Sequence, residues 1–235
     1  MKAKPNNAQL ALIADDEKKR AGKVIYNVNS ILLRKYHTID LGEYYNALMG
    51  NVEPKFIAMF YGPPSAGKSV FTFQFANYFA KHHGKVLYNS HEERIKKTVR
   101  DRIELYNIKA PRLHFGDAIP FHQMMEKITR NRYRLVVIDS VQYMDFTFDQ
   151  LQELSATFKK RLLSVVMVSF GQNWGKPYKA EELLYASDIK GFFDMPADTA
   201  IVRFASRYKS TQVKSELFRV SEEFIPQPQP NAELL

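Results

Sequence analysis

The segment from Gly62 to Ser69 constrains the fold of this chain more than any other part of the sequence. It reads GPPSAGKS and follows the apolar run FIAMFY (residues 56–61), which has the composition of a buried strand. Apolar residues at helical spacing follow from Lys68 to His83, and Gly84 then stands at the position of a C-terminal helix cap. The sequence therefore predicts a strand, a glycine-containing loop and a helix in direct succession.

This segment matches the phosphate-binding pattern G-x-x-x-x-G-K-[ST] in the structural context that the pattern requires. Backbone N–H groups at the start of a helix form a concave anion site, and glycines let a phosphate approach closely. Lys68 is expected to contact the β- and γ-phosphates of ATP, and Ser69 to bind Mg²⁺. Pro63 and Pro64 have no N–H, so the amides of the following residues must form the cradle. The candidate nucleotide-binding residues are Gly62, Ser65, Ala66, Gly67, Lys68 and Ser69.

Two further predicted strands are followed by acidic residues that ATP chemistry can use. The strand RLVVID ends in Asp139, which we expect to hold Mg²⁺ through water; the alternative is that Asp139 caps the next turn. The strand KVLYN (residues 85–89) is followed by Glu92 and Glu93, where a carboxylate can polarise the water that attacks the γ-phosphate. Glu92 is our first choice because it lies closer to the strand end. Glu93 can instead open the following helix, where the helix dipole favours acids.

The remainder of the chain alternates apolar strands with helical segments. Residues 24–49 predict a short strand or helix and then a helix ending at Gly50. Later helices are expected at residues 93–106, 121–131 and 150–161, and strands at residues 112–115 and 163–169. This alternation predicts an α/β fold with a mainly parallel sheet covered on both faces, and two late strands near residues 199–205 and 215–220 predict an antiparallel edge. We expect a flexible arm (residues 1–24), one ATPase domain (25–225) and a disordered Pro/Gln-rich tail (226–235).

Composition excludes several classes of protein. The chain has no cysteine, so disulfides, zinc ribbons and cysteine nucleophiles are excluded. No stretch approaches the roughly 20 consecutive apolar residues of a membrane helix, and the first residues lack the apolar region of a signal peptide. We therefore expect a cytoplasmic protein that does not bind membranes. The formal net charge of +9 favours a polyanionic partner.

Taken together, these motifs resemble the RecA-like ATPases, most closely the RadA and DnaB-like replicative-helicase branch with the related KaiC-type ATPases. The resemblance covers about residues 38–220 and rests on the lead-in IDLGEYYNALMGNVEPKFIAMFYG, on VLYNSHEE and on VVIDSVQYM. It implies a three-layer α/β RecA-like P-loop NTPase core with a mainly parallel central sheet, and ATP and Mg²⁺ as cofactors. The resemblance assigns nucleotide binding, catalysis and metal binding to Lys68, Ser69, Glu92 and Asp139.

The resemblance also implies three further site residues. Gln172, in VMVSFGQNWGK, takes the place of a polar residue that senses the γ-phosphate. Arg207 and Lys209, in FASRYKS, take the place of two basic residues that one subunit supplies to the ATP of its neighbour, which implies a homo-oligomeric ring or filament. Alternation would place both on one face of a strand; the alternative is a solvated edge strand. The KNRFG-like motif of RadA is absent.

A predicted loop from Gly171 to Gly191 mixes aromatic and basic residues where RecA-like proteins place a DNA-binding loop. Aromatic faces stack on bases while lysines contact phosphates, which suits single-stranded DNA. The candidate nucleic-acid-binding residues are Trp174, Lys176, Tyr178 and Lys179. The alternative is that Trp174 and the tyrosines pack the loop onto the sheet. Basic segments at residues 96–102 and 130–134 could extend a phosphate track, although such helix faces are commonly just solvated.

Three functional hypotheses follow from these features. The first is a DNA-dependent RecA-like ATPase acting in recombination, repair or replication. The second is a KaiC-like regulatory ATP switch, in which oligomerisation or a protein partner responds to nucleotide. A small-molecule P-loop kinase is disfavoured, because such enzymes need a substrate lid and an acceptor site and because the glutamate after the second strand favours hydrolysis.

Overall fold

The structure is a computed structural model that describes residues 25–194, 201–209 and 216–219. The chain divides into two units, one up to His37 and one from Thr38 onward. The described part of the first unit contains helix α2 (Val28–Leu32), whose N-cap Asn27 accepts a hydrogen bond from the backbone of Ser30 at 2.8 Å. The arm and tail expected at residues 1–24 and 226–235 lie outside the described residues, and the domain boundaries stay predictions.

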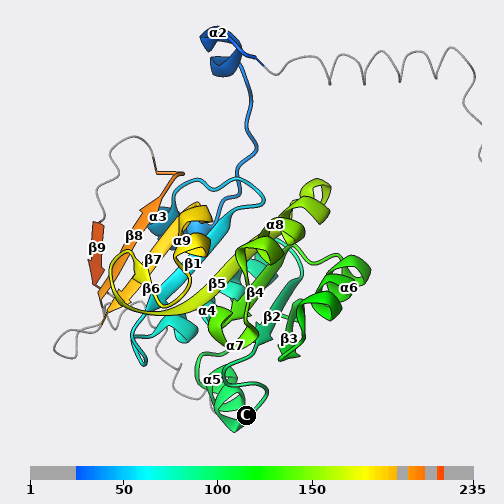
Figure 1. Ribbon diagram of the computed structural model, residues 1–235, viewed down its shortest axis with the longest axis vertical. Coiled ribbons are helices and arrows are strands. Elements are labelled where there is room, and N and C mark those ends of the chain that lie inside the picture. The colour runs from blue at the N-terminus through cyan, green and yellow to red at the C-terminus, as the bar shows by residue number, and fades with distance from the viewer. Residues whose placement is uncertain (1–24, 195–200, 210–215, 220–235) are drawn as a thin grey trace, which may run out of the picture. The chain divides into compact units, whose positions relative to one another are not determined.

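The second unit is built on one sheet with the strand order β3-β2-β4-β5-β1-β7-β8-β9, and β6 pairs with β5 (Figure 1). The described strands are β1 (Ile57–Gly62), β2 (Val86–Ser90), β3 (Leu113–Asp117), β4 (Leu135–Asp139), β5 (Ser164–Asn173), β6 (Lys176–Pro177), β7 (Ile189–Asp194), β8 (Ile201–Ser206) and β9 (Glu216–Arg219). The strands from β3 to β7 in this order are parallel, whereas β8 and β9 join antiparallel. The predicted mainly parallel sheet with an antiparallel edge is confirmed.

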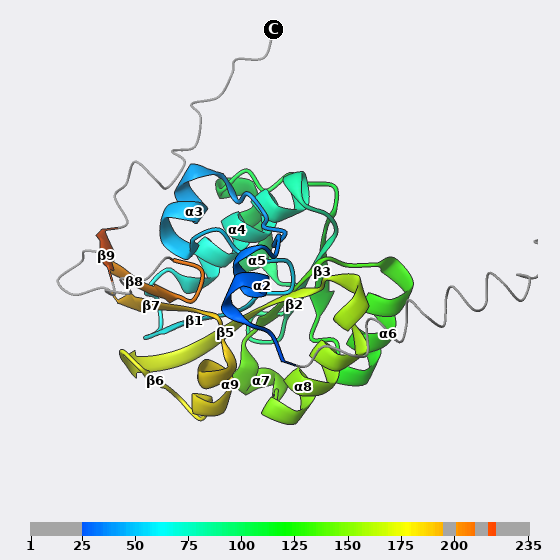
Figure 2. The same cartoon turned by 90° about the horizontal axis from the view of Figure 1, so that it is seen from above.

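Helices cover both faces of this sheet (Figure 2). One face packs against α3 (Gly42–Met49), α4 (Lys68–His82) and α5 (Lys97–Leu105). The other packs against α6 (Phe121–Asn131), α7 (Val141–Met144), α8 (Phe148–Thr157) and α9 (Glu181–Ala186), and the 3₁₀ turn η1 (Lys159–Arg161) follows α8. Successive strand residues point to opposite faces, so the apolar strands contribute to both cores. The predicted three-layer α/β arrangement is confirmed, and no helix among the described residues is long and apolar enough to cross a membrane.

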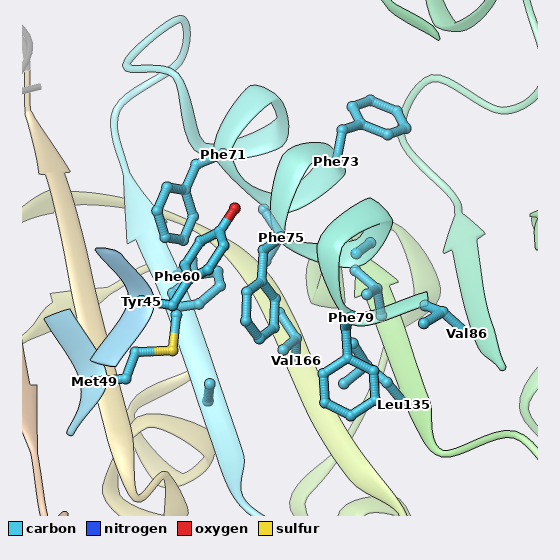
Figure 3. Close-up of a cluster of buried hydrophobic side chains, with 14 of the residues drawn as sticks. Tyr45, Met49, Phe60, Phe71, Phe73, Phe75, Phe79, Val86, Leu135 and Val166 are labelled. Atoms are coloured by element: carbon cyan, nitrogen blue, oxygen red, sulfur yellow. The ribbon is translucent and has the colours of Figure 1, made fainter. Parts of the chain in front are cut away.

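Aromatic packing fixes helix α4 on the sheet (Figure 3). Phe71, Phe75 and Phe79 stand four residues apart, which places them on one face of the helix. They are buried, and Phe71 and Phe75 both contact Phe60 of β1, with ring centroids at 5.2 and 6.4 Å. Each fully buried side chain of this size contributes about 1.5–3 kcal/mol. Because α4 begins at the P-loop, this packing also fixes the helix terminus that faces the predicted phosphate site.

The helix predicted at residues 150–161 is α8 followed by η1, and α7 was not predicted. Three other differences bear on the predicted site residues. Helix α5 begins at Lys97 rather than Glu93, because Arg94 has a φ of 58° that an α-helix cannot contain. The loop expected from Gly171 to Gly191 is a β5–β6 hairpin followed by α9 and β7, and Gly175 (φ 78°) reverses the chain in the hairpin. Strand β8 ends at Ser206, so Arg207 and Lys209 lie in the following turn and not on one strand face.

Candidate nucleotide-binding site

The P-loop joins β1 to α4 at the edge where the parallel strands end, which we call the carboxyl edge. Gly62 ends β1, and a Cβ there would lie 2.0 Å from the backbone oxygen of Phe193. Gly67 is the N-cap of α4 with a φ of 87°, a left-handed conformation that favours glycine. A Cβ on Gly67 would meet nothing within 4 Å, so the space beside it is open. The first glycine therefore permits strand packing, and the second forms the loop beside open space.

Lys68 bends back across this loop. Its side chain is largely buried, and Nζ donates a hydrogen bond to the backbone oxygen of Pro63 at 2.6 Å. Nζ also lies 5.8 Å from the ring centroid of Phe170 on β5. Burial lowers the pKa of Lys68, whereas Glu92 and Asp139 raise it. The lysine is thus close to both candidate carboxylates, and a phosphate would be a stronger acceptor than the Pro63 carbonyl.

Asp139 stands at the end of β4, opposite Ser90 at the end of β2, and is 5% exposed. The Tyr88 hydroxyl donates a hydrogen bond to Oδ2, whereas Oδ1 is buried without a hydrogen-bond partner among the described residues. Burial raises the pKa of Asp139, and the hydrogen bond from Tyr88 lowers it. The nearby Ser69 hydroxyl also lowers the pKa of Asp139.

These oxygens fit a magnesium ion. Mg²⁺ takes hard oxygen ligands, and in nucleotide sites it commonly uses one or two protein groups together with phosphates and water. The unpaired Oδ1 of Asp139 is such a ligand, and a cation there would offset the cost of the buried carboxylate. Ser69 lies in the first turn of α4, close enough to affect the pKa of Asp139.

The loop after β2 places Glu92 beside these groups. The backbone N–H groups of His91 and Glu92 donate to the backbone oxygen of Asp139, at 2.5 and 3.2 Å. Burial raises the pKa of Glu92, Asp139 raises it further, and Lys68 lowers it. The half-buried carboxylate of Glu92 therefore shares one electrostatic environment with the lysine and the aspartate.

Glu93 has different partners. Its Oε1 forms an ion pair with Arg102 of α5 at 2.6 Å, and its Oε2 accepts a hydrogen bond from the Thr98 hydroxyl at 3.1 Å. Both carboxylate oxygens of Glu93 therefore contact side chains of α5. The structure ties Glu93 to the helix that follows, while a catalytic role for either glutamate stays a prediction.

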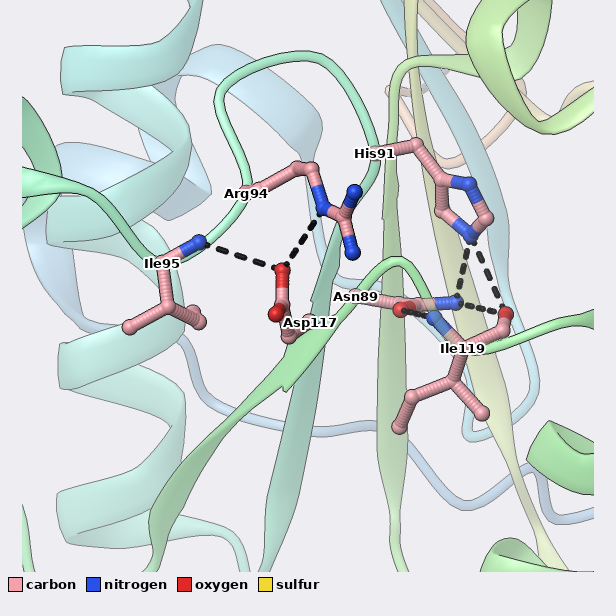
Figure 4. A network of polar contacts seen from close by, with 6 residues as sticks. All are labelled: Asn89, His91, Arg94, Ile95, Asp117 and Ile119. Carbon is pink, nitrogen blue, oxygen red and sulfur yellow. Dashed lines mark hydrogen bonds and ion pairs between the residues drawn. The ribbon is translucent and has the colours of Figure 1, made fainter.

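A polar network anchors this loop to the end of β3 (Figure 4). The Asn89 side chain donates to the Ile119 carbonyl at 2.8 Å and accepts from the Ile119 N–H at 2.9 Å, while His91 Nε2 lies 3.0 Å from the same carbonyl. Arg94 forms an ion pair with Asp117 at 3.1 Å. Burial lowers the pKa of His91. The loop is therefore held on both sides of Glu92, through residues that sequence reasoning did not identify.

The β5–β6 hairpin lies beside the P-loop, and together with Pro64 it lines an open cavity of about 750 Å³. The cavity is lined by Pro64, Phe170, Gly171, Gln172, Asn173, Lys176, Pro177, Tyr178, Lys179 and Glu181. Gln172 is exposed on this wall, and Tyr178 is 57% exposed. Cavities of this size accommodate small ligands or parts of larger ones. The structure therefore brings four of the predicted residues (Gln172, Lys176, Tyr178 and Lys179) to one wall close to the nucleotide site.

Trp174 is different, because it packs on the sheet. Its ring lies 6.3 Å from that of Tyr61 and 6.3 Å from that of Phe192, between centroids, and the guanidinium of Arg203 lies 5.3 Å from its ring centroid. For Trp174 the structure therefore agrees with the alternative, in which aromatic residues pack the loop onto the sheet. A contact between Trp174 and nucleic acid stays a prediction.

The side chain of Gln142, on α7 just after Asp139, forms hydrogen bonds with the β5–β6 hairpin. Its Nε2 donates to the Ser169 hydroxyl at 2.8 Å and to the Tyr178 carbonyl at 2.6 Å, and its Oε1 accepts from the Phe170 N–H at 3.3 Å. Sequence reasoning missed this residue. The only signal was an amide side chain three residues after the strand-ending aspartate.

Arg207 and Lys209 lie at the edge where the parallel strands begin, which we call the amino edge. Strand β8 is antiparallel to β7, and its last residue, Ser206, stands opposite Ile189, the first residue of β7. Arg207 forms an ion pair with Asp188 at 3.2 Å. The structure does not bring these residues to the P-loop of their own chain, and their supply to a neighbouring subunit stays a prediction.

The sheet order, the P-loop between β1 and α4 and the three-layer arrangement define a RecA-like α/β P-loop core. Among solved structures, the chain is similar to a KaiC-like protein of the hyperthermophilic archaeon Pyrococcus horikoshii, with a TM-score of 0.59 and 14% sequence identity over 79% of this chain and 94% of that one. No protein-family model and no curated protein sequence matches the chain. At this identity the likeness shows the fold, and it gives no support to a special closeness to RadA or DnaB-like helicases.

Proposed function

We propose that this chain binds ATP with Mg²⁺ and hydrolyses it. The observation that carries the proposal is the meeting of three groups at the carboxyl edge. They are the buried lysine of the P-loop (Lys68), the half-buried Glu92 and the buried Asp139 with its unpaired oxygen. A cation, a carboxylate base and a metal ligand that influence one another electrostatically are the set that phosphoryl transfer to water requires.

Each residue has a distinct role in this proposal. The amides that begin α4 and the Lys68 ammonium hold the phosphates. Ser69 and Asp139 hold Mg²⁺, which neutralises charge on the phosphates when it is bound. Glu92 orients the attacking water and accepts its proton. Its raised pKa brings its basicity closer to the operating pH, where a general base is most effective.

We further infer that hydrolysis depends on single-stranded DNA bound at the hairpin, which would place the protein in recombination, repair or replication. Exposed Tyr178 with Lys176 and Lys179 offers a stacking surface and two cations. Gln142 supports coupling, because it bonds the hairpin backbone at Tyr178 from the helix that follows Asp139. The alternative is a KaiC-like ATP switch that works through oligomerisation or a protein partner.

The test is the ATPase rate of the wild type and of Lys68→Ala at low salt, with and without single-stranded DNA. Lys81→Ala is the matched control, because Lys81 is an exposed lysine in the last turn of the same helix. We expect hydrolysis and its DNA stimulation to vanish in Lys68→Ala and to persist in Lys81→Ala. Hydrolysis that needs Lys68 but ignores DNA would favour the switch, and hydrolysis that survives Lys68→Ala would contradict the proposal.

A further inference from the structure

Basic residues precede five neighbouring strands at the amino edge, opposite to the P-loop. In the sheet order β3-β2-β4-β5-β1 these residues are Arg112, Lys85, Arg134, Arg161 and Lys55, which we call the basic row. Neighbouring strands lie about 4.8 Å apart, so four intervals give the row a length of about 19 Å. Two more lysines, Lys159 and Lys160, adjoin Arg161 in η1.

Backbone and side-chain contacts show that the row is continuous. The backbone oxygen of Lys85 accepts from the N–H of Arg134 at 2.8 Å, and the backbone oxygen of Arg112 accepts from the N–H of Val86 at 2.9 Å. The Arg134 guanidinium donates to the Arg161 carbonyl at 3.4 Å. These bonds place the basic residues of the row next to one another along the sheet edge from β3 to β5.

Part of this charge has a structural explanation. The α4 and α6 helices end at this edge, where cations favour the helix dipole. The Arg112 guanidinium bonds the Lys81 carbonyl of α4, and that of Arg161 bonds the Thr129 carbonyl of α6. The three lysines Lys85, Lys159 and Lys160 lack this explanation. They are exposed, and their side chains make no hydrogen bond or ion pair with any described residue.

Among the described residues, few carboxylates oppose the row. Asp40 lies beside His83 at the end of α4, Glu53 lies two residues before Lys55, and Asp188, which precedes β7, is already paired with Arg207. The basic segment on α5 is different, because Lys97 pairs with Asp101 at 2.6 Å and other cations of α5 pair likewise. The cations of the row form no ion pair with a described carboxylate, unlike Lys97, Arg100 and Arg102 of α5.

We propose that the basic row binds the phosphate backbone of a nucleic acid, without reading its sequence. A strand of nucleic acid carries regularly spaced charges that can follow such a row, and lysines with no protein partner release counterions when they meet phosphates. Exposed aromatic side chains are absent from the described residues of the row, so base stacking is not part of this contact. The inference goes beyond ATP hydrolysis and does not require it.

The test compares two triple variants with the same change of charge. Lys85→Gln/Lys159→Gln/Lys160→Gln removes the unpaired lysines, and Lys96→Gln/Lys97→Gln/Arg100→Gln on α5 is the matched control. Binding to fluorescent single-stranded DNA and to duplex DNA is measured without nucleotide over a salt series. Thermal unfolding confirms that both variants fold.

We expect the row variant to bind about tenfold more weakly at low salt, and its salt slope to fall by about 2 for single strands or about 2.7 for duplex. The control should lose much less, since Lys97 and Arg100 are already paired. The relative loss on the two DNAs identifies which form the row prefers. Lys68→Ala should bind as the wild type does, which separates this inference from the proposed ATPase.

Three results would overturn the inference. They are equal affinity and slope in the row variant and the wild type, an equal loss in the control variant, and failure of the wild type to bind either DNA at low salt. A parallel series with poly-glutamate and with anionic lipid vesicles identifies other occupants. If the row variant loses binding to one of these while keeping its binding to DNA, the partner is not a nucleic acid.

Discussion

Replacing Tyr88 by phenylalanine tests how the buried carboxylate of Asp139 is held. Tyr88 is fully buried, its ring stacks on Phe73 with centroids 4.6 Å apart and planes 7° apart, and its hydroxyl bonds Asp139 Oδ2. Burial raises the pKa of Tyr88 well above its usual value, so the hydroxyl remains a donor at any working pH. Phenylalanine keeps the ring and its packing. The variant therefore removes one hydrogen bond and little else.

The expected loss follows from the charge of the acceptor. A hydrogen bond to an ionised group contributes about 1.5–3 kcal/mol, and its removal leaves Oδ2 buried and unsatisfied. For a chain of this size 1 kcal/mol corresponds to roughly 2–4 °C, so the melting temperature should fall by about 3–12 °C. The hydrogen bond lowers the pKa of Asp139, so its loss should raise that pKa further. The stability difference should be largest where Asp139 is ionised and should shrink as the pH falls below its pKa.

Thermal unfolding near neutral and at acid pH measures the first effect, and the Mg²⁺ requirement of ATP hydrolysis measures the second. A carboxylate with a higher pKa stays protonated to a higher pH, and the proton competes with Mg²⁺, so near that pKa half-maximal activity should need more Mg²⁺ and a higher pH. Tyr133→Phe is the matched control, because the buried Tyr133 hydroxyl lies 2.8 Å from His114 Nδ1, away from Asp139. If the Tyr88 variant loses no more stability than this control and keeps the wild-type Mg²⁺ requirement, the assigned role of Tyr88 is wrong.

Four further variants test the remaining assignments. Glu92→Gln should reduce hydrolysis by about 10²–10⁴-fold while ATP still binds. Glu93→Gln should mainly weaken the contact to α5. If the two variants lose the same fraction of the hydrolysis rate in single-turnover assays, this distinction is wrong. Asp139→Asn should abolish Mg²⁺-dependent hydrolysis and yet raise the melting temperature near neutral pH. Because the pKa of Asp139 is raised, the stability that this residue contributes is present at low pH and is lost as the pH rises through that pKa. A melting temperature of the variant that is unchanged or lowered near neutral pH would refute the argument. Gln142→Ala should leave the basal ATPase rate near that of the wild type and reduce its stimulation by DNA, and an unchanged ratio of stimulated to basal rate would show that Gln142 does not couple the two sites.

The elements that the sequence predicted well are those defined by local patterns. Helix α6 has the predicted bounds, Phe121–Asn131, because apolar periodicity and the preceding proline specify it within a few turns. The P-loop is equally local, since its glycines, Lys68 and Ser69 are consecutive with the strand and helix that position them. The position of Asp139 at the carboxyl edge could also be predicted, because parallel strands end at one edge of the sheet.

Contacts between distant segments could not be predicted in this way. Tyr88 and Asp139 are 51 residues apart, and Gln142 reaches a carbonyl 36 residues later, so no local spacing indicates either hydrogen bond. The hairpin was missed for a related reason. The segment around Gly175 has loop composition, but Gly175 N–H donates to the Tyr61 hydroxyl at 2.7 Å, and this tertiary contact helps to hold the hairpin.

The two edges of the sheet carry different chemical groups, because the parallel strands all begin at one edge and end at the other. At the carboxyl edge, β4 ends at the buried Asp139, whose Oδ1 has no hydrogen-bond partner among the described residues, so a bound cation can offset the unfavourable buried charge. At the amino edge, α4 and α6 end and their carbonyls bond Arg112 and Arg161, whereas Lys85, Lys159 and Lys160 are exposed there without such a contact. A ligand at the first edge must therefore meet a buried carboxylate and bring a metal, whereas a ligand at the second meets solvated charges whose attraction falls with salt. Salt dependence is thus the physical property that separates binding at the Asp139 site from binding at the basic row.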